Sequence, residues 1–142
     1  MRKVLLSLML ILFGHISFGA EIKELKSYPM NSADNIITKT GVEFDNTVSS
    51  DGEGSLKIDA EKPTVIHLFE TGDIDIENAK LIYKADLKTE NVTGNVYLEM
   101  WCQFNDKGEY FSRALNDPFT GTEGWKSQET PFFLKKVKTL TT

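Results

Sequence analysis

Residues 96–104, VYLEMWCQF, decide the fold because their side chains alternate in character. Successive side chains of a β-strand point to opposite faces, so this alternation sorts the stretch into two sides. One side is wholly apolar and belongs in a core, and the other combines two aromatic rings with a carboxylate and an amide. The apolar side holds Val96, Leu98, Met100, Cys102 and Phe104, and the mixed side holds Tyr97, Glu99, Trp101 and Gln103. We therefore expect a half-buried strand whose outer face suits a polar ligand with apolar patches.

The residues that follow predict a hairpin. The link NDKG ends in Gly108, which is typical of a tight turn between two strands. One register would bury Arg113 without a partner, which is costly. A shift of one residue at Gly108 instead places Phe111 and Arg113 beside Trp101 and Glu99. We favour this register, and it predicts a cross-strand ion pair whose role is either structural or ligand-binding. In this register the side chains of Tyr110, Ser112 and Ala114 point inward.

Other short segments with a period of two predict further strands, and no window has a convincing helical period. These segments are residues 42–45, 55–60, 64–70, 80–88, 109–115 and 125–134. Loops rich in Gly, Asn and Asp separate them, at residues 46–54, 71–78, 89–94 and 116–124. In residues 80–88 the inward side chains are Leu81, Tyr83, Ala85 and Leu87, and the outward ones are Ile82, Lys84, Asp86 and Lys88. Pro131 predicts an edge position or a bulge. The pattern indicates an all-β, antiparallel β-sandwich or barrel.

The N-terminus has the features of a secretory signal peptide over residues 1–20. Arg2 and Lys3 precede an apolar run that is too short to span a bilayer as a stable helix. Small residues favour cleavage near Gly19 and Ala20, and the alternative is an uncleaved anchor. We expect an exported protein, secreted or periplasmic. Residues 21–35 are predicted to be an exposed lead-in with a short helical turn at 21–26, followed by the sandwich domain at 36–142.

Charge and cysteine content exclude several classes of function. Without Arg2 and Lys3, 14 of the 16 basic residues remain against 21 acidic ones, so the mature chain is near −7. Such a chain is a poor partner for nucleic acid or for an anionic membrane surface. No second apolar run predicts a membrane span after signal cleavage. Cys102 is the one cysteine, and we interpret it as a small core residue, the alternative being a reactive thiol.

Three segments, in their order along the chain, resemble segments of galactose-binding-like jelly rolls. That family includes the carbohydrate-binding modules of bacterial cellulases and xylanases. The segments are GEGSLKI, LIYKADLKTENVTGNVYLEMWCQF and TGTEGWKSQETPFFL. The family's Y-x-A-x-x-K pattern is matched by Tyr83, Ala85 and Lys88, and its T-G-T-x-x-W pattern by Thr120, Gly121, Thr122 and Trp125. The resemblance spans residues 42–136 and implies a jelly-roll fold and glycan binding without catalysis.

One departure from the family concerns the C-terminus. Family members usually continue with two more strands, the last carrying paired aspartates, whereas this chain ends at Thr142. The sandwich is therefore predicted to be incomplete there, truncated or closed differently. The family's calcium site commonly uses one of those aspartates, so we predict no metal and no cofactor. Asp45, Asp51 and Glu53 are the residues that calcium would use if it bound, and the alternative is that they form turns.

The sequence-based hypothesis is a non-catalytic glycan-binding module. Aromatic rings stack on the apolar faces of sugars while carboxylates and amides bond their hydroxyls. The first alternative is a structural or protein-binding domain of the cell envelope, and the second is a glycoside hydrolase using Glu99 and Asp86. His67 has no second ligand at metal-binding spacing. The predicted ligand-binding residues are Tyr97, Glu99, Trp101, Gln103, Lys84, Asp86 and Arg113.

Overall fold

The computed structural model describes residues 3–15, 20–105 and 107–135, and within these ranges it contains strands and no helix. Accordingly, no helix of the described chain is long and apolar enough to cross a membrane. The all-β prediction is confirmed. The strands are β1 (Lys3–His15), β2 (Ala20–Tyr28), β3 (Val42–Asp45), β4 (Ser55–Asp59), β5 (Ala79–Val96), β6 (Glu99–Phe104), β7 (Gly108–Arg113) and β8 (Phe119–Leu134).

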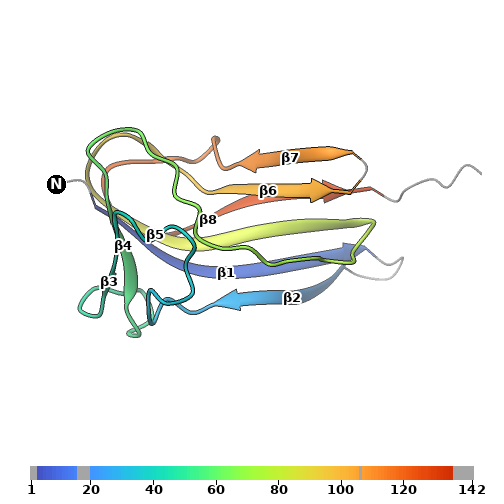
Figure 1. Cartoon of the computed structure of the whole chain (residues 1–142), viewed down its shortest axis with the longest axis horizontal. Coiled ribbons are helices and arrows are strands. Elements are labelled where there is room, and N and C mark those ends of the chain that lie inside the picture. Colours follow the sequence, from blue (N-terminus) through green and yellow to red (C-terminus); the bar gives the residue numbers. More distant parts are fainter. Residues whose placement is uncertain (1–2, 16–19, 106, 136–142) are drawn as a thin grey trace, which may run out of the picture.

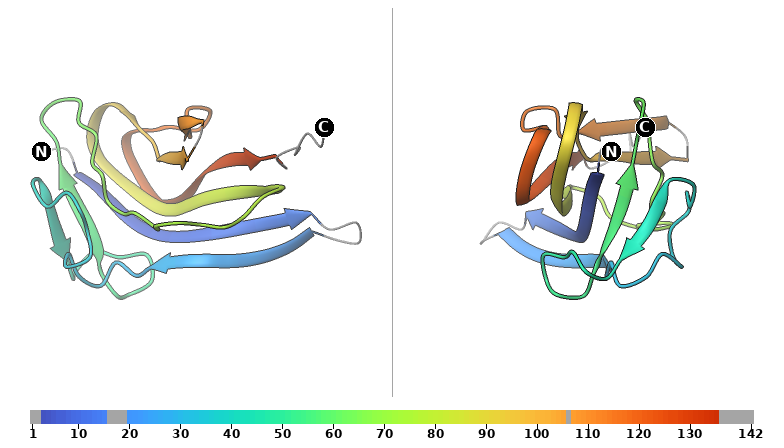
Figure 2. Two further views of the ribbon diagram at one scale, coloured as in Figure 1. Left: turned by 45° about the vertical axis from the view of Figure 1, so that its right-hand side comes forward. Right: turned by 90° about the vertical axis from the view of Figure 1, so that its left-hand side faces the viewer.

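Two antiparallel sheets make up the described structure (Figure 1). The larger has the order β3-β4-β1-β5-β8, with β2 also paired to β1, and the smaller is the β6–β7 hairpin. The long strands of the larger sheet curve strongly, and the hairpin lies over one of its faces (Figure 2). This arrangement is consistent with a β-sandwich. β8 lies at an edge of the larger sheet, as the proline at position 131 predicted.

The core lies against the larger sheet, and it takes in no residue of β6 or β7 but includes Leu98 and Ala114, which flank the hairpin. Its buried side chains come from four strands and the adjoining loops, and they include Leu56, Ala85, Leu87, Leu98 and Phe119. Alternation along β5 therefore predicted the core face correctly at Ala85 and Leu87. It was wrong at Ile82, which is buried on the opposite face. Ile82 belongs to a central strand, and its register partner on β8, Pro131, flanks it on the same face.

Three predicted segments differ from the structure. Residues 64–70 do not form a strand, although Ile37 and Thr38 donate backbone hydrogen bonds to the carbonyls of Leu68 and His67. The predicted loops at 89–94 and 116–124 are largely strand, because β5 runs on to Val96 and β8 begins earlier than expected. Shifts in the β5–β8 register accommodate the turn-forming residues that suggested loops.

The predicted signal peptide, residues 1–20, overlaps a strand of the folded structure. Residues 3–15 form β1, which pairs with β2, β4 and β5, while the predicted cleavage site includes Gly19, outside the described residues. The signal peptide stays a prediction. Residues 21–26 belong to β2 rather than to a helical turn, because they pair with β1. The lead-in is also not wholly exposed, since Met30 is buried in the core and Tyr28 packs against it.

Candidate functional site

The hairpin has the register that the sequence favoured. Glu99 is opposite Arg113 and Trp101 is opposite Phe111. Gly108 closes the turn at a φ of 83°, a left-handed conformation that glycine adopts without steric cost. The prediction of a Glu99–Arg113 cross-strand ion pair is confirmed.

The inner face of the hairpin is attached to β8 by packing and hydrogen bonds. The Ser112 hydroxyl lies 2.5 Å from the Thr130 hydroxyl and donates to the Pro131 carbonyl at 2.6 Å. The rings of Phe104 and Phe132 are 6.0 Å apart. Ala114 is buried and Ser112 is half-buried, as predicted, but Tyr110 is exposed. Tyr110 is on the inward-facing register position, yet its ring meets Phe104 edge-on and remains accessible to solvent.

Gln128 is a structural residue that sequence reasoning missed. Its side chain accepts a hydrogen bond from the Leu98 backbone N–H at 2.6 Å and donates one to the Asp117 carbonyl at 2.6 Å. The residue is only 3% exposed, and its bond to the Leu98 N–H is buried. A buried backbone group that loses its partner costs free energy. Gln128 thus fixes the start of β6 and the chain before β8 to the core.

The outer face of the hairpin carries two exposed aromatic rings. Trp101 is 50% exposed and Phe111 is 49% exposed. Their ring centroids are 5.1 Å apart at an interplanar angle of 43°. The Arg113 guanidinium lies over the Phe111 ring, with its Cζ 4.2 Å from the ring centroid. The rings therefore form a fixed, partly apolar surface that a cation borders at one end.

Glu99 holds this surface together. One of its carboxylate oxygens accepts a hydrogen bond from the Trp101 indole N–H, and the other accepts one from Arg113 Nε. The Glu99 side chain is 14% exposed and that of Arg113 is 35% exposed. Bonds to an ionised group are stronger than neutral ones. The carboxylate consequently fixes the orientation of both the indole and the guanidinium.

Tyr97 does not join this face. β5 ends at Val96 and β6 begins at Glu99, so the predicted continuous strand is interrupted between them. Tyr97 is half-buried and packs against the hydrophobic core. The uninterrupted alternation that placed it beside Trp101 was wrong at this point. Gln103, farther along β6, is exposed and lies opposite Glu109 on the outer face.

Lys84 and Asp86 lie on the other side of the larger sheet. Their register partners on β8 are Glu129 and Ser127, and Asp86 accepts a hydrogen bond from the Ser127 hydroxyl. The alternate β8 residues, including Thr130, face the hairpin. The structure therefore separates Lys84 and Asp86 from Trp101 by the thickness of the sandwich. It also places Glu99 and Asp86 on opposite outer faces.

The calcium candidates act as turn formers. Asp45 Oδ1 accepts hydrogen bonds from the Thr47 hydroxyl at 2.7 Å and the Thr47 backbone N–H at 2.8 Å. These bonds, the hydroxyl's first, lower the pKa of Asp45. Asp51 Oδ1 accepts from the backbone N–H of Glu53 at 2.9 Å. Across the described ranges there is no group of three His, Cys, Asp or Glu residues that could hold a metal ion.

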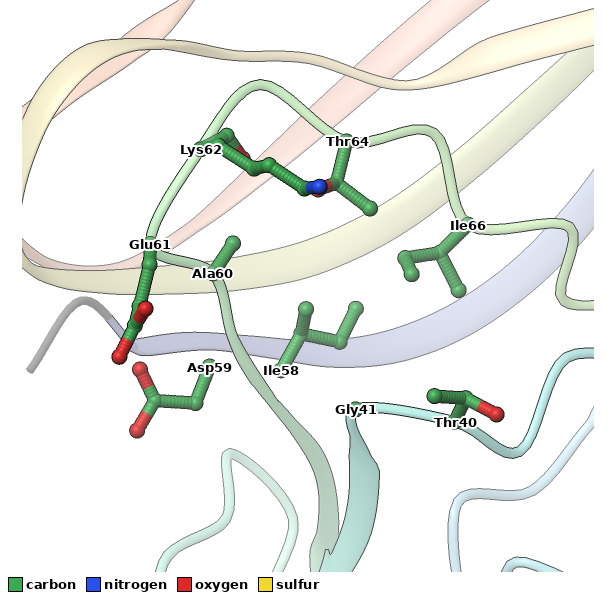
Figure 3. Close-up of a pocket in the computed structure, with 9 residues that line it drawn as sticks. All are labelled: Thr40, Gly41, Ile58, Asp59, Ala60, Glu61, Lys62, Thr64 and Ile66. Atoms are coloured by element: carbon green, nitrogen blue, oxygen red, sulfur yellow. The ribbon is translucent and has the colours of Figure 1, made fainter.

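A pocket of about 420 Å³ lies away from the hairpin. Residues at the end of β4, before β3 and in the loop after β4 line it, and Figure 3 shows Ile58 and Ile66 in its middle. The carboxylates of Asp59 and Glu61 gather at one side, while Lys62 and Thr64 lie together at another (Figure 3). None of the lining residues belongs to β6 or β7.

Comparisons of the chain with protein-family models, with curated proteins and with solved structures found no match.

Proposed function

We propose that the protein binds glycan, without catalysis, through the outer face of the β6–β7 hairpin. The observation that carries this proposal is the pair of half-exposed rings, Trp101 and Phe111, held at a fixed mutual angle. Large aromatic side chains exposed side by side are unusual on a surface with no binding role. Gln103 and Arg113 supply polar groups around them, and Glu99 orients Trp101 and Arg113.

The geometry suits a sugar ring for two reasons. The apolar face of a pyranose stacks on an aromatic ring, while charged and amide groups at the border bond its hydroxyls. In addition, the Glu99 hydrogen bonds hold Trp101 and Arg113 before any ligand arrives. Groups that are already ordered lose less conformational entropy on binding, so a small site gains affinity.

The sequence resemblance to galactose-binding-like jelly rolls supports the same proposal. We extend it to the fold and propose that the two antiparallel sheets are a jelly-roll variant. The resemblance also argues against catalysis, because the family that the sequence resembles is known for non-catalytic modules. The separation of Glu99 from Asp86 removes the one carboxylate pair considered for a glycosidase.

A second candidate is a protein-binding role of the β6–β7 hairpin. Four residues of the hairpin are of the types that dominate the binding energy of protein interfaces. They are Trp101, Tyr110, Phe111 and Arg113. A protein partner would need an area larger than the two rings, including the exposed Leu115 beyond β7. The glycan proposal needs only the rings and their border, and we favour it for that reason.

Affinity electrophoresis in gels that contain soluble polysaccharides tests the proposal. The wild-type protein should be retarded by at least one polysaccharide, and Trp101→Ala should migrate as in a gel without it. Phe133→Ala is the matched control, because Phe133 is also exposed but is on the face of β8 away from the hairpin. If a broad panel of glycans leaves the wild type unretarded, the protein-binding candidate replaces this one.

A further inference from the structure

The hydrogen-bonding capacity of Arg113 is only partly used. Its Nε donates to Glu99 and the face of its guanidinium lies over Phe111. Within the described part of the chain, its two terminal nitrogens, Nη1 and Nη2, have no hydrogen-bond partner. A guanidinium presents its donors in a planar fork that matches two oxygens of a carboxylate. The unused end of Arg113 is thus a preformed donor pair beside the exposed rings.

Glu99, in contrast, has little capacity left for a ligand. Both of its oxygens already accept hydrogen bonds from Trp101 and Arg113, and its side chain is largely covered. The indole N–H of Trp101 is likewise occupied. Of the groups that border the two rings at this end, Arg113 is the one that offers free donors. This end of the face therefore favours a ligand that brings acceptors, above all charged ones.

We propose that Arg113 recognises the carboxylate of an acidic sugar, a uronic acid residue, whose ring packs on Trp101 and against the part of Phe111 that Arg113 leaves exposed. This inference rests on the proposed glycan binding and specifies its ligand class. The carboxylate of a uronic acid projects from the rim of the sugar ring. A ring stacked on the aromatic pair can therefore direct its carboxylate at the guanidinium beside Phe111.

The negative charge of the rest of the molecule leaves the recognition of a carboxylate by Arg113 largely unaffected. The chain has a net charge of −5, and Glu109 is on the same outer face as Arg113, at the opposite end of β7. Four residues of strand separate them by about 13 Å, which exceeds the distance over which exposed charges interact strongly in physiological salt. Recognition is thus local to Arg113, whose guanidinium engages one carboxylate of the ligand.

The test compares two probes that differ in charge and, apart from that, only by the methyl group of the ester. A short oligomer of galacturonic acid and its methyl ester are titrated into the full chain by isothermal calorimetry. The acid should bind at least about tenfold more tightly than the ester, a difference of about 1.4 kcal/mol, since the ester cannot form a charge-assisted hydrogen bond with the guanidinium. Arg113→Gln should remove the preference, and Arg113→Lys, which keeps the charge but lacks the fork, should lose most of it.

Lys84→Gln is the control for charge alone, because Lys84 is on the far side of the larger sheet, and it should keep the preference. Circular dichroism of each variant confirms that it is folded before titration. Equal binding of acid and ester would overturn the acidic-sugar inference and leave glycan binding in place. If neither probe binds but a neutral polysaccharide does, the inference is also wrong. Failure of every glycan, acidic or neutral, would overturn the proposed function itself.

Discussion

Strands β1 and β6 both carry many apolar residues, but their patterns differ. β1, KVLLSLMLILFGH, is apolar at nearly every position, whereas β6, EMWCQF, alternates. β1 pairs with three other strands near the middle of the larger sheet, and β6 pairs only with β7. A continuous apolar run is typical of a strand covered on both faces, and alternation is typical of a strand with one face in solvent.

The difference shows which patterns identify a structure and which do not. Alternation in β6 distinguishes the buried side from the open side on the residues alone. The run in β1 indicates only an apolar environment, and a central strand and the apolar part of a signal peptide both satisfy it. The two interpretations of β1 predict opposite results for the stability of a chain that lacks it, and this stability can be measured.

Deleting residues 1–19 should have the largest effect. β1 provides register partners to β5 over residues 79–90 and to β4 over residues 56–59. Its loss would leave the backbone groups that pair with it on both strands without partners. The free energy cost of so many unpaired groups exceeds a typical domain stability of about 5–15 kcal/mol. We expect the shortened chain to lack a cooperative unfolding transition in urea, monitored by circular dichroism.

The control is the full chain, expressed without export so that residues 1–19 remain. A shortened chain that unfolds cooperatively would show that β1 is dispensable and would favour the signal-peptide interpretation. Mass spectrometry of the protein recovered after export gives the natural N-terminus directly. A start at residue 20 or 21 with a stable fold would contradict the role of β1 as a structural strand.

Replacing a buried and an exposed aromatic residue sharpens the comparison between inner and outer faces. Phe119 is fully buried at the start of β8, and Trp101 is half-exposed on β6. Phe119→Ala should lower the free energy of unfolding by about 3–5 kcal/mol, because it leaves a cavity in the core. Trp101→Ala should cost much less and should instead abolish glycan binding. Chemical denaturation of both variants measures this, and similar losses of stability would contradict the assignment of faces.

The sequence predicted the hairpin in detail because its constraints are local. The turn glycine, the cost of burying Arg113 and the alternation of β6 together specify one register. Tyr97 and Ile82 show where this reasoning fails. Whether a strand is interrupted, as at Tyr97, or central, as at Ile82, depends on neighbours that are distant in sequence. Grouping Lys84 and Asp86 with Trp101 failed for the same reason, since alternation does not say which sheet faces another.

Two glutamines test the attachment of the hairpin. Gln128→Leu should lower the free energy of unfolding by about 1–3 kcal/mol, because the Leu98 N–H and the Asp117 carbonyl lose a buried partner. Gln103→Leu, at an exposed position of β6, should change it by no more than about 0.5 kcal/mol. Thermal unfolding followed by Trp fluorescence measures both. Equal shifts would show that Gln128 does not hold the hairpin in place.

A double-mutant cycle measures the Glu99–Arg113 pair. The single variants Glu99→Gln and Arg113→Gln and their combination should give a coupling energy of about 0.2–1 kcal/mol, since the pair is partly exposed. The coupling should shrink in high salt, because ions screen exposed charges. Urea unfolding at low and high salt provides the values. A coupling of zero at low salt would mean that the pair does not orient the outer face.

The smallest effect is expected at Cys102, on the inner face of the hairpin. Burial raises the pKa of its thiol, so the folded chain keeps this proton to a higher pH than the unfolded chain does. The unfolded state then binds fewer protons above its own thiol pKa of about 8.5. Stability should be fully present at neutral pH and should decline slightly as the pH rises through that value. Urea unfolding between pH 7 and pH 9.5 tests this, with Cys102→Ala as the control that lacks the decline. If the two proteins lose stability equally over this range, the thiol faces solvent and the inner and outer faces of β6 are not distinguished at this position.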